Sequence, residues 1–212
     1  MTIYKTCTEY WLDPQTGAFR GEFEAMYQDI ADPWGCEAGK SSLNNQIFLD
    51  IIFDANRRYD RILDIGCGLG ALLNTVRQRN QGGYVLGVDV SRTAIQKAKE
   101  RYPELHFDCR NIAKERLEEG DFDLVVLSEV LWYILDDLPS FFSRVAAMLR
   151  PAGLLAIHQY FPAEQRFGRE RVDGLPGFLQ LMERQRPLLR RHMYTNHHPD
   201  GLVLLSTFQK EK

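Results

Sequence analysis

The stretch Arg61-Ile62-Leu63-Asp64-Ile65-Gly66-Cys67-Gly68-Leu69-Gly70 contains the strongest structural signal in the chain. Its first half is an apolar run typical of a buried strand, and three glycines then occupy alternate positions before a segment of helical character. Glycines tolerate positive φ and have no Cβ, so such a turn bends sharply and lets a flat polar ligand approach its N–H groups. The stretch therefore predicts a strand, a ligand-binding turn and a helix start.

Two carboxylates narrow the choice of ligand. The glycine spacing also fits a dinucleotide fingerprint, but Asp64 stands two residues before the first glycine, where a carboxylate favours a cation over a pyrophosphate. Asp89 ends an apolar run about 20 residues later, at the position of an acid that accepts hydrogen bonds from both ribose hydroxyls of a nucleoside. A dinucleotide accounts for the glycines and Asp89 but leaves Asp64 unexplained.

The order Asp-x-Gly-x-Gly-x-Gly at residues 64–70 resembles the first motif of class I S-adenosylmethionine-dependent methyltransferases, whose loop wraps the amino-acid end of the cofactor. The resemblance extends from residue 61 to the end of the sequence. It implies S-adenosyl-L-methionine as cofactor and S-adenosyl-L-homocysteine as product. The cofactor-binding residues that it implies are Asp64, Gly66, Cys67, Gly68, Gly70, Asp89, Val90, Asn111, Ile112, Ser128 and Glu129.

The adenine-binding position departs from the family pattern. Methyltransferases commonly place an acidic residue there, whereas alignment by the preceding strand puts Asn111 at this point, with Ile112 as an apolar face beside the adenine. The side-chain oxygen of an asparagine accepts the same hydrogen bond, and Asp108 takes the role if the register is shifted.

Strand-like runs alternate from residue 61 onward with segments long enough for crossover helices. The pattern predicts an α/β, doubly wound, mainly parallel seven-stranded sheet with a C-terminal antiparallel hairpin, the Rossmann-like class I methyltransferase fold. The expected strands are 61–65, 84–90, 105–109, 123–127, 154–160, 188–195 and 202–208. A helix is expected at 138–149, ended by Pro151 and Gly153, with one turn at 113–117 and a loop or short helix at 165–177.

Residues 1–57 are predicted to form an N-terminal helical cap on a cofactor-binding core of residues 58–212, within one methyltransferase domain. An apolar stripe predicts a first helix, which ends at Asp32-Pro33-Trp34, and consists of Phe19, Phe23, Met26, Tyr27 and Ile30. A second helix is expected after Ser41-Ser42. Packing alone can explain the stripe, but a ligand at the carboxyl ends of the strands needs a cover, for which Tyr10, Trp11 and Trp34 are candidates.

The run of residues 122–134 places Ser128 and Glu129 at the end of a buried strand and follows them with aromatic residues. Together with Asp32-Pro33-Trp34, it is similar to its counterpart in nodulation-type N-methyltransferases, which act on the amino sugar of chitooligosaccharides. The aromatic strand end is also shared with many small-molecule methyltransferases. The substrate-binding candidates are Trp34, Trp132, Tyr133 and Tyr160.

Two residues at strand ends are candidate proton acceptors. Glu129 follows one strand directly, and His158 lies near the end of the next, so either side chain can receive the proton of an amine or hydroxyl acceptor. The structural alternatives are that Glu129 caps a turn or contacts the cofactor, and that His158 only packs within the sheet.

Composition limits the possible partners and the compartment. The 212 residues are 44% hydrophobic with a formal net charge of −3, which gives no electrostatic reason to expect nucleic acid or a membrane. The four cysteines show neither metal-ligand spacing nor a disulfide framework, so no metal is expected. We expect a soluble cytoplasmic protein, a monomer or homodimer, that acts on a small molecule.

The sequence therefore favours an S-adenosylmethionine-dependent methyltransferase that carries out N- or O-methylation of a sugar or polar metabolite. Three alternatives stay open. They are an RNA methyltransferase, an NAD-dependent oxidoreductase, and a non-catalytic module that binds S-adenosylmethionine. Enzymes that methylate exocyclic amines of nucleic-acid bases commonly carry Asn or Asp, Pro-Pro and an aromatic residue after this strand, which differs from Ser128-Glu129-Val130-Leu131.

Overall fold

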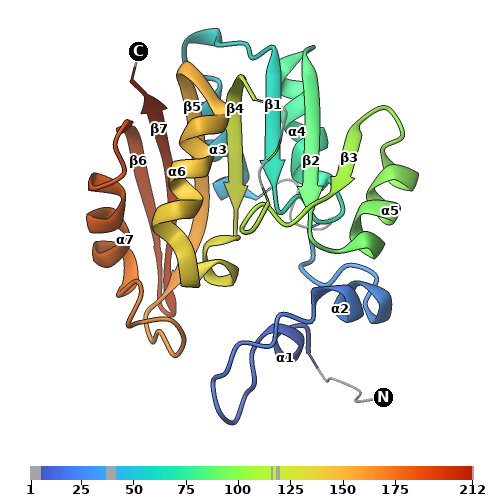
Figure 1. Ribbon diagram of the computed structural model, residues 1–212, viewed down its shortest axis with the longest axis vertical. Coiled ribbons are helices and arrows are strands. Elements are labelled where there is room, and N and C mark those ends of the chain that lie inside the picture. Colours follow the sequence, from blue (N-terminus) through green and yellow to red (C-terminus); the bar gives the residue numbers. More distant parts are fainter. Residues whose placement is uncertain (1–5, 37–41, 116, 118–119, 212) are drawn as a thin grey trace.

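The computed structural model describes residues 6–36, 42–115, 117 and 120–211. Its centre is a seven-stranded sheet with the order β3-β2-β1-β4-β5-β7-β6 (Figure 1). Strands β1 to β5 run parallel, and β7 is antiparallel to both β5 and β6, which confirms the predicted fold class. The strands are β1 (Arg61–Ile65), β2 (Tyr84–Asp89), β3 (His106–Cys109), β4 (Phe122–Ser128), β5 (Leu149–Pro162), β6 (Leu188–His198) and β7 (Gly201–Lys210).

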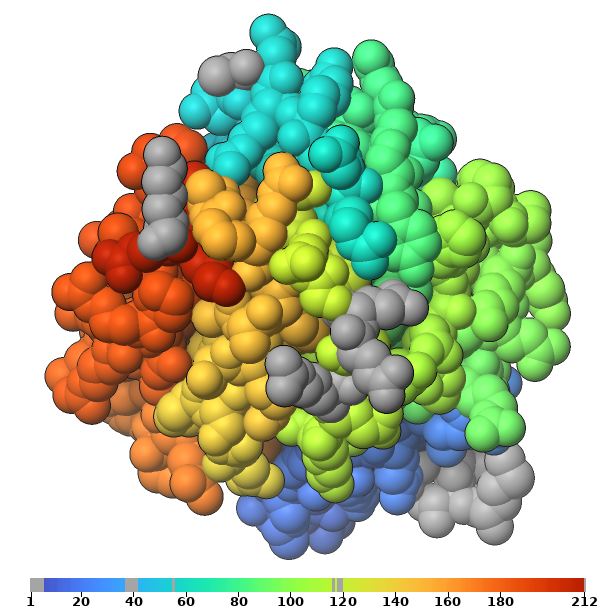
Figure 2. Space-filling model, turned by 45° about the horizontal axis from the view of Figure 1, so that its top comes forward, coloured from blue at the N-terminus to red at the C-terminus, as the bar shows by residue number. Residues whose placement is uncertain are grey.

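Helices cover both faces of the sheet. Along β1 and β4, alternate residues face opposite sides, so Ile62 and Leu124 pack in one buried cluster while Leu63 and Val125 pack in another. The first cluster includes buried residues of α3 (Leu43–Ile52), α4 (Ala71–Asn80) and α5 (Arg92–Arg101). The second includes those of α6 (Leu138–Met148) and α7 (Gly174–Glu183). In Figure 2 the C-terminal hairpin and the region of β2 to α5 lie on opposite sides of the molecule.

Two boundaries near β5 differ from the sequence prediction. The strand begins at Leu149, which pairs with Phe122, whereas the predicted strand began at Leu154. The residues between them form a bulge in which Ala152 has a φ of 64°, so the proline and glycine expected to separate helix from strand lie inside the strand. The final hairpin turn is also tighter than predicted, because pairing continues to His198 and Gly201.

The N-terminal stripe belongs to two structures rather than one helix. Helix α2 spans Phe23–Asp29, while Phe19 forms an isolated antiparallel bridge with Leu12, after the short helix α1 (Thr8–Trp11). The second predicted helix is α3, whose first turn is capped by the Ser42 hydroxyl, which accepts a hydrogen bond from the Asn45 N–H at 3.2 Å. Ser41 lies outside the described residues. The turn predicted after β3 is present at residues 112–114.

Glu24 attaches the N-terminal segment to the core. Its carboxylate accepts hydrogen bonds from the Ser91 hydroxyl at 2.7 Å and from the Thr93 hydroxyl and N–H at 2.6 and 3.2 Å, at the start of α5. Partial burial opposes ionisation, but the hydrogen bonds from Thr93 and Ser91 outweigh it and lower the pKa of Glu24 to about 2. Figure 1 shows α1 and α2 beyond the carboxyl ends of β1, β2 and β4.

We predict that Glu24→Ala loosens this attachment without unfolding the core. Alanine preserves the helical preference of α2 but removes bonds to a charged group, so local opening should become easier by about 1 kcal/mol. Because the folded pKa lies below the ordinary value of 4.5, the wild-type contact is complete above pH 4.5 and weakens as the pH falls toward 2. Hydrogen exchange of the α2 amides measures the opening. Glu104→Ala, on an exposed turn, is the control, and equal protection of α2 in both variants would contradict the prediction.

Candidate active site

A cavity of about 950 Å³ lies at the carboxyl ends of β1, β2 and β4. This volume is at the upper end of the range for small-molecule sites, enough for a nucleoside cofactor and a small acceptor. Its walls come from the glycine turn, the start of α4, the 3₁₀ helix η3 (Leu131–Tyr133) and the N-terminal segment. The N-terminal residues that line it include Phe19, Phe23, Tyr27, Trp34 and Cys36.

The glycine turn is held by strand β2. The N–H groups of Gly66 and Cys67 both donate to the Val88 carbonyl, at 2.8 and 3.0 Å. Gly68 has a φ of +52°, and a Cβ there would lie 2.7 Å from the Tyr27 hydroxyl. The turn therefore needs glycine both for its backbone angle and for the close approach of the N-terminal segment.

Asp64 is a buried acid that lacks a partner. Its side chain lies in the cavity wall with 2% of its surface exposed, and within the described part of the chain its Oδ2 atom has no hydrogen-bond partner. Burial, with a smaller contribution from the charge of Asp89, raises the pKa of Asp64 to about 8. A positively charged ligand group beside this oxygen would supply the missing partner.

Asp89 has a double role in the wall. Its Oδ2 accepts a hydrogen bond from the Gly68 N–H at 3.0 Å and its Oδ1 accepts one from the Ser91 N–H at 2.9 Å, so it fixes both the turn and the start of α5. Burial raises the pKa of Asp89, although these N–H donors act in the opposite direction. Each carboxylate oxygen keeps a further lone pair for a ligand hydroxyl. Val90 follows with 47% of its surface exposed and lines the same cavity.

The structure separates the two candidates for the adenine position. Asn111 and the buried Ile112 line the cavity, as does Cys67 in the glycine turn. Asp108 is absent from the wall and accepts a hydrogen bond from Arg110 Nε at 2.7 Å. The geometry therefore favours Asn111 over Asp108.

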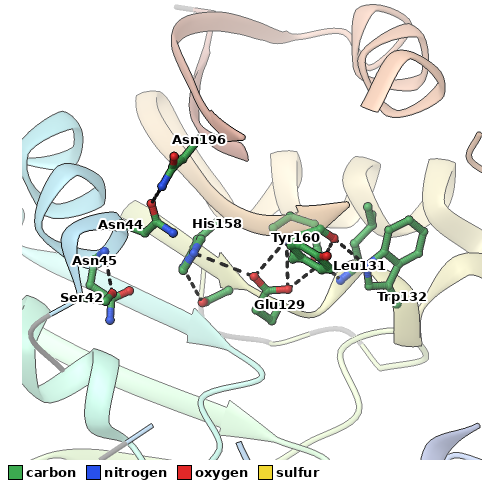
Figure 3. Close-up of polar contacts among 11 residues, drawn as sticks. Ser42, Asn44, Asn45, Glu129, Leu131, Trp132, His158, Tyr160 and Asn196 are labelled. Carbon is green, nitrogen blue, oxygen red and sulfur yellow. Dashed lines mark hydrogen bonds and ion pairs between the residues drawn. The ribbon is translucent and has the colours of Figure 1, made fainter. Parts of the chain in front are cut away.

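Glu129 is clamped at the end of β4 in a strained backbone conformation with a φ of 56°. Its two carboxylate oxygens accept hydrogen bonds from the Tyr160 N–H at 3.0 and 3.1 Å, and Oε2 also accepts one from Gln159 Nε2 at 2.9 Å (Figure 3). The side chain keeps 43% of its surface exposed because it faces the cavity.

His158 lies next to Glu129 with a separation of 3.9 Å between Nε2 and Oε1. On the other side of the ring, Nδ1 lies 3.3 Å from the Ser128 hydroxyl, and all three residues line the cavity (Figure 3). Burial raises the pKa of Glu129 to about 7, against the opposing Tyr160 N–H, and lowers the pKa of His158 to about 4. With these pKa values the histidine is uncharged at neutral pH, and Glu129 titrates close to it.

Aromatic rings from three parts of the chain also meet at the cavity. Tyr133 is their centre, with ring centroids 4.9 Å from Phe23, 5.2 Å from Trp11 and 6.0 Å from Trp34. Phe167 stacks on Phe19 at 5.8 Å. We call this set the aromatic cluster, and its members are Trp11, Phe19, Phe23, Trp34, Tyr133 and Phe167.

Three further candidate residues, Trp132, Trp34 and Tyr10, are each held by a side-chain hydrogen bond. Trp132 lines the cavity while its Nε1 donates to the Tyr160 carbonyl at 2.9 Å. Trp34 Nε1 donates to the Tyr27 hydroxyl at 3.0 Å. Tyr10 is buried, and its hydroxyl donates to Asp29 Oδ2 at 2.8 Å, so it stabilises the N-terminal segment.

Two predicted site residues lie outside the cavity wall. The Tyr160 hydroxyl donates to the Asp200 carbonyl at 2.7 Å, so the phenol is used in the β6–β7 turn and only the backbone N–H reaches the site. Gly70 has a φ of 82° and a Cβ there would lie 2.8 Å from the Phe107 ring, so it is required for packing at the start of α4. The direction of the Tyr160 ring and the packing against Gly70 depend on tertiary contacts that spacing along the chain does not give.

Sequence reasoning also missed residues that the fold brings to the site. Gln159, Phe167 and the pair Ser42 and Asn45 were not among the candidates. Gln159 is polar at a position buried within a strand, which is the one signal that was available for it. The others come from loops and helices whose approach to the cavity depends on tertiary packing.

Two further properties concern the described residues as a whole. Within the ranges given above, no cluster of three or more His, Cys, Asp and Glu side chains is arranged to hold a metal ion. None of the helices in those ranges has the length and apolar character needed to span a membrane.

Comparison with known proteins shows which families and relatives this chain resembles in sequence. Residues 63–155 match the family described as methyltransferase domain. A ubiquinone biosynthesis O-methyltransferase of Rhodopseudomonas palustris is 36% identical over 100 residues, which cover 46% of the chain and 38% of the relative. One of Nitrobacter winogradskyi is 31% identical over 163 residues, which cover 68% and 60%. The chain thus spans between about two fifths and three fifths of the length of these curated relatives.

Solved structures share the fold over most of the chain. The N-methyltransferase NodS from Bradyrhizobium japonicum, in complex with S-adenosyl-L-homocysteine, superimposes with a TM-score of 0.72 at 21% identity and covers 91% of this chain and 97% of that one. A TehB-like methyltransferase from Corynebacterium glutamicum gives a TM-score of 0.67 at 24% identity, with 88% and 99% covered. Residues 63–155 therefore carry the sequence pattern of a methyltransferase domain, and the chain has the class I methyltransferase fold.

Proposed function

We propose that this protein transfers a methyl group from S-adenosyl-L-methionine to a nitrogen or oxygen of a small polar molecule, such as a sugar or another polar metabolite. The observation that carries the proposal is the unpartnered, buried Asp64 oxygen beside the glycine turn, with Asp89 at the end of the next strand. The two acids match the ammonium and the ribose of this cofactor, and the relatives named above support both oxygen and nitrogen acceptors.

The residues fit the cofactor along its whole length. Asp64 accepts a hydrogen bond from the amino group at the amino-acid end, and Asp89 accepts from the ribose hydroxyls. Asn111 takes the adenine amino group, with Val90 and Ile112 against the ring. Gly66 and Gly68 let the backbone approach the ligand, and the walls at Cys67, Ser128 and Glu129 lie along it.

The bound cofactor supplies a sulfonium that makes its methyl group reactive toward a nucleophile. The chain has to align the acceptor and exclude water. The aromatic cluster supports this role because it brings α1, α2, η3 and the loop before α7 together over the cavity. We propose that residues 1–57 act as this cap and residues 58–212 as the core, with Trp34, Trp132 and Tyr133 facing the acceptor.

Glu129 is the best candidate to receive the acceptor's proton. An amine that arrives as ammonium has no lone pair for attack, so it must first lose a proton. The pKa of Glu129 near 7 suits this exchange at neutral pH, whereas the pKa of His158 near 4 leaves the ring uncharged. We propose that His158 contacts the acceptor as a neutral hydrogen-bonding group.

The alternatives are less well supported. NAD has no cationic amino-acid end for Asp64. An RNA substrate would need a strongly basic surface, whereas the formal net charge is −3 and three of the cations in the cavity wall, Arg20, Arg110 and Arg171, pair with the carboxylates of Asp13, Asp108 and Asp136. A module that only binds the cofactor would not need a proton-exchanging group at the acceptor side. The cytoplasmic location and the monomeric or homodimeric state stay predictions from the sequence.

The direct experiment is to incubate the purified protein with S-adenosyl-L-methionine and a panel of amines, phenols, sugars and carboxylic acids. We expect S-adenosyl-L-homocysteine to form with at least one amine or hydroxyl compound. Calorimetry should show binding of S-adenosyl-L-methionine and its demethylated product but not of NAD. Binding of NAD without binding of either methyltransferase ligand would refute the proposal.

Asp64→Asn should weaken cofactor binding and stabilise the ligand-free protein. Loss of a charge-assisted bond should weaken S-adenosyl-L-methionine binding by about 1.5–3 kcal/mol, roughly 10- to 150-fold. The wild-type pKa is raised from 3.8 to about 8, so the folded acid costs stability as the pH rises through this window. Without the ligand, the variant should therefore be more stable at pH 8.5, on the order of a few kcal/mol, and the gain should vanish near pH 4.

Calorimetry and urea unfolding at several pH values measure the two effects. Asp121→Asn, which changes an exposed acid just before β4 and outside the cavity wall, is the matched control and should change neither. An Asp64→Asn variant that binds the cofactor as tightly as the wild type would show that the orphan oxygen does not hold the ammonium.

Glu129→Gln should abolish the ionisation near pH 7 in the rate of methyl transfer. With an amine acceptor, the wild-type rate rises as Glu129 loses its proton with a pKa of about 7. Removing a general base should lower the rate about 10²- to 10⁴-fold while cofactor affinity changes little. His158→Ala should keep the ionisation, because the pKa of that ring is about 4. Identical pH profiles for wild type and Glu129→Gln would show that Glu129 does not act as the base and that the site only positions the acceptor.

A further inference from the structure

Gln159 on β5 is a polar residue in the core, with 1% of its surface exposed. All of its hydrogen-bonding atoms are engaged. Its Oε1 accepts from the Leu131 N–H at 3.0 Å, and its Nε2 donates to Glu129 Oε2 at 2.9 Å and to the Tyr160 carbonyl at 3.2 Å. A buried amide with every bond satisfied holds its neighbours in one arrangement.

The direction of this amide is fixed by chemistry. The Leu131 N–H only donates, so the oxygen of Gln159 must face it and the NH₂ group must face Glu129. The amide therefore always presents a donor to the carboxylate. It also joins Glu129 to Leu131, the first residue of η3, which carries Trp132 and Tyr133.

The bonds to Glu129 come from the strand side. Tyr160 N–H reaches both carboxylate oxygens and Gln159 reaches Oε2, while the side chain faces the cavity. Because Glu129 sits on a backbone with a φ of 56°, its side chain leaves the chain in an unusual direction and these contacts select its orientation.

We infer that Gln159 is a positioning residue that holds the Glu129 carboxylate toward the acceptor and favours its ionised form. This inference rests on the proposed function, since it assigns Gln159 a part in receiving the acceptor's proton. Gln159 itself points to Glu129, Leu131 and Tyr160 and lies outside the cavity wall, so it acts through Glu129.

Other ionisable groups lie near Glu129 in the described structure. They are His158 on β5, with Nε2 at 3.9 Å, the phenol of Tyr133 on η3, and, as a weaker electrostatic neighbour, the phenol of Tyr160, which bonds to the Asp200 carbonyl. Burial raises the pKa of both phenols above the ordinary value of 10, and that of His158 is lowered to about 4, so none of them titrates near pH 7. A change in the titration near pH 7 can then be attributed to the Glu129 carboxyl group.

The test removes the donor. Gln159→Met keeps the length of the side chain but loses its N–H, so the ionised carboxylate loses a hydrogen bond and its pKa should rise by about one unit. Gln159→Glu keeps an oxygen for the Leu131 N–H and places a second acid against Glu129, so the pair should hold a shared proton to still higher pH. The second variant keeps the backbone contact if the first is poorly folded.

The measurement is ¹³C NMR of labelled glutamate carboxyl groups across pH, with the Glu129 signal assigned by its absence in Glu129→Gln. The matched control is Gln209→Met, which removes a glutamine bond to the Ala152 carbonyl at the opposite end of the sheet. Its Glu129 titration should equal that of the wild type. S-adenosyl-L-methionine affinity should stay within about twofold in the Gln159 variants, because Asp64 and Asp89 are untouched.

We expect the pH–rate profile for methyl transfer to an amine to move to higher pH together with the NMR titration. Glu129 titration curves in Gln159→Met and Gln159→Glu that superimpose on the wild type would overturn the inference. The NMR measurement needs neither cofactor nor acceptor. A wild-type protein that transfers no methyl group would refute the proposed function, whereas an unchanged titration refutes only the role of Gln159.

Discussion

Two carboxylates, Asp64 and Asp89, lie buried at the carboxyl ends of adjacent parallel strands, and the site is built around the cost of keeping their charges out of water. Asp89 is stabilised by two backbone N–H groups, which in turn fix the glycine turn and the start of α5. Asp64 has an oxygen without a partner in the described structure. The protein thus carries a local instability that a cationic ligand relieves, and stability is exchanged for binding.

The N-terminal segment is coupled to the same two strands. Glu24 binds Ser91, which also donates its N–H to Asp89, and the Tyr27 hydroxyl lies where a side chain at Gly68 would be. Lys97 on α5 also donates to the Tyr27 carbonyl at 2.5 Å. The N-terminal segment is therefore bonded to α5 and packed against the glycine turn, so changes in the segment and in the turn should affect each other.

The environment gives Glu129 and His158 different pKa values, whereas the sequence offered both equally as proton acceptors. Burial disfavours the charged form of each group, so it raises the pKa of the acid and lowers that of the base. Glu129 also keeps its donors, the Tyr160 N–H and Gln159, and faces the cavity. The His158 ring lies between the Ser128 hydroxyl and Glu129 and is uncharged at neutral pH.

The sequence by itself determined the strand–turn–helix at residues 61–77, the parallel sheet and the position of Asp64 and Asp89 at the strand ends, because these depend on local periodicity and glycine backbone angles. Tertiary structure alone decided the rest. The Tyr160 phenol bonds to the Asp200 carbonyl, Phe19 pairs with Leu12 outside α2, and Gln159 reaches both Glu129 and Leu131. These outcomes depend on side-chain direction and on contacts between segments far apart in sequence, and such contacts leave no period or spacing in the chain.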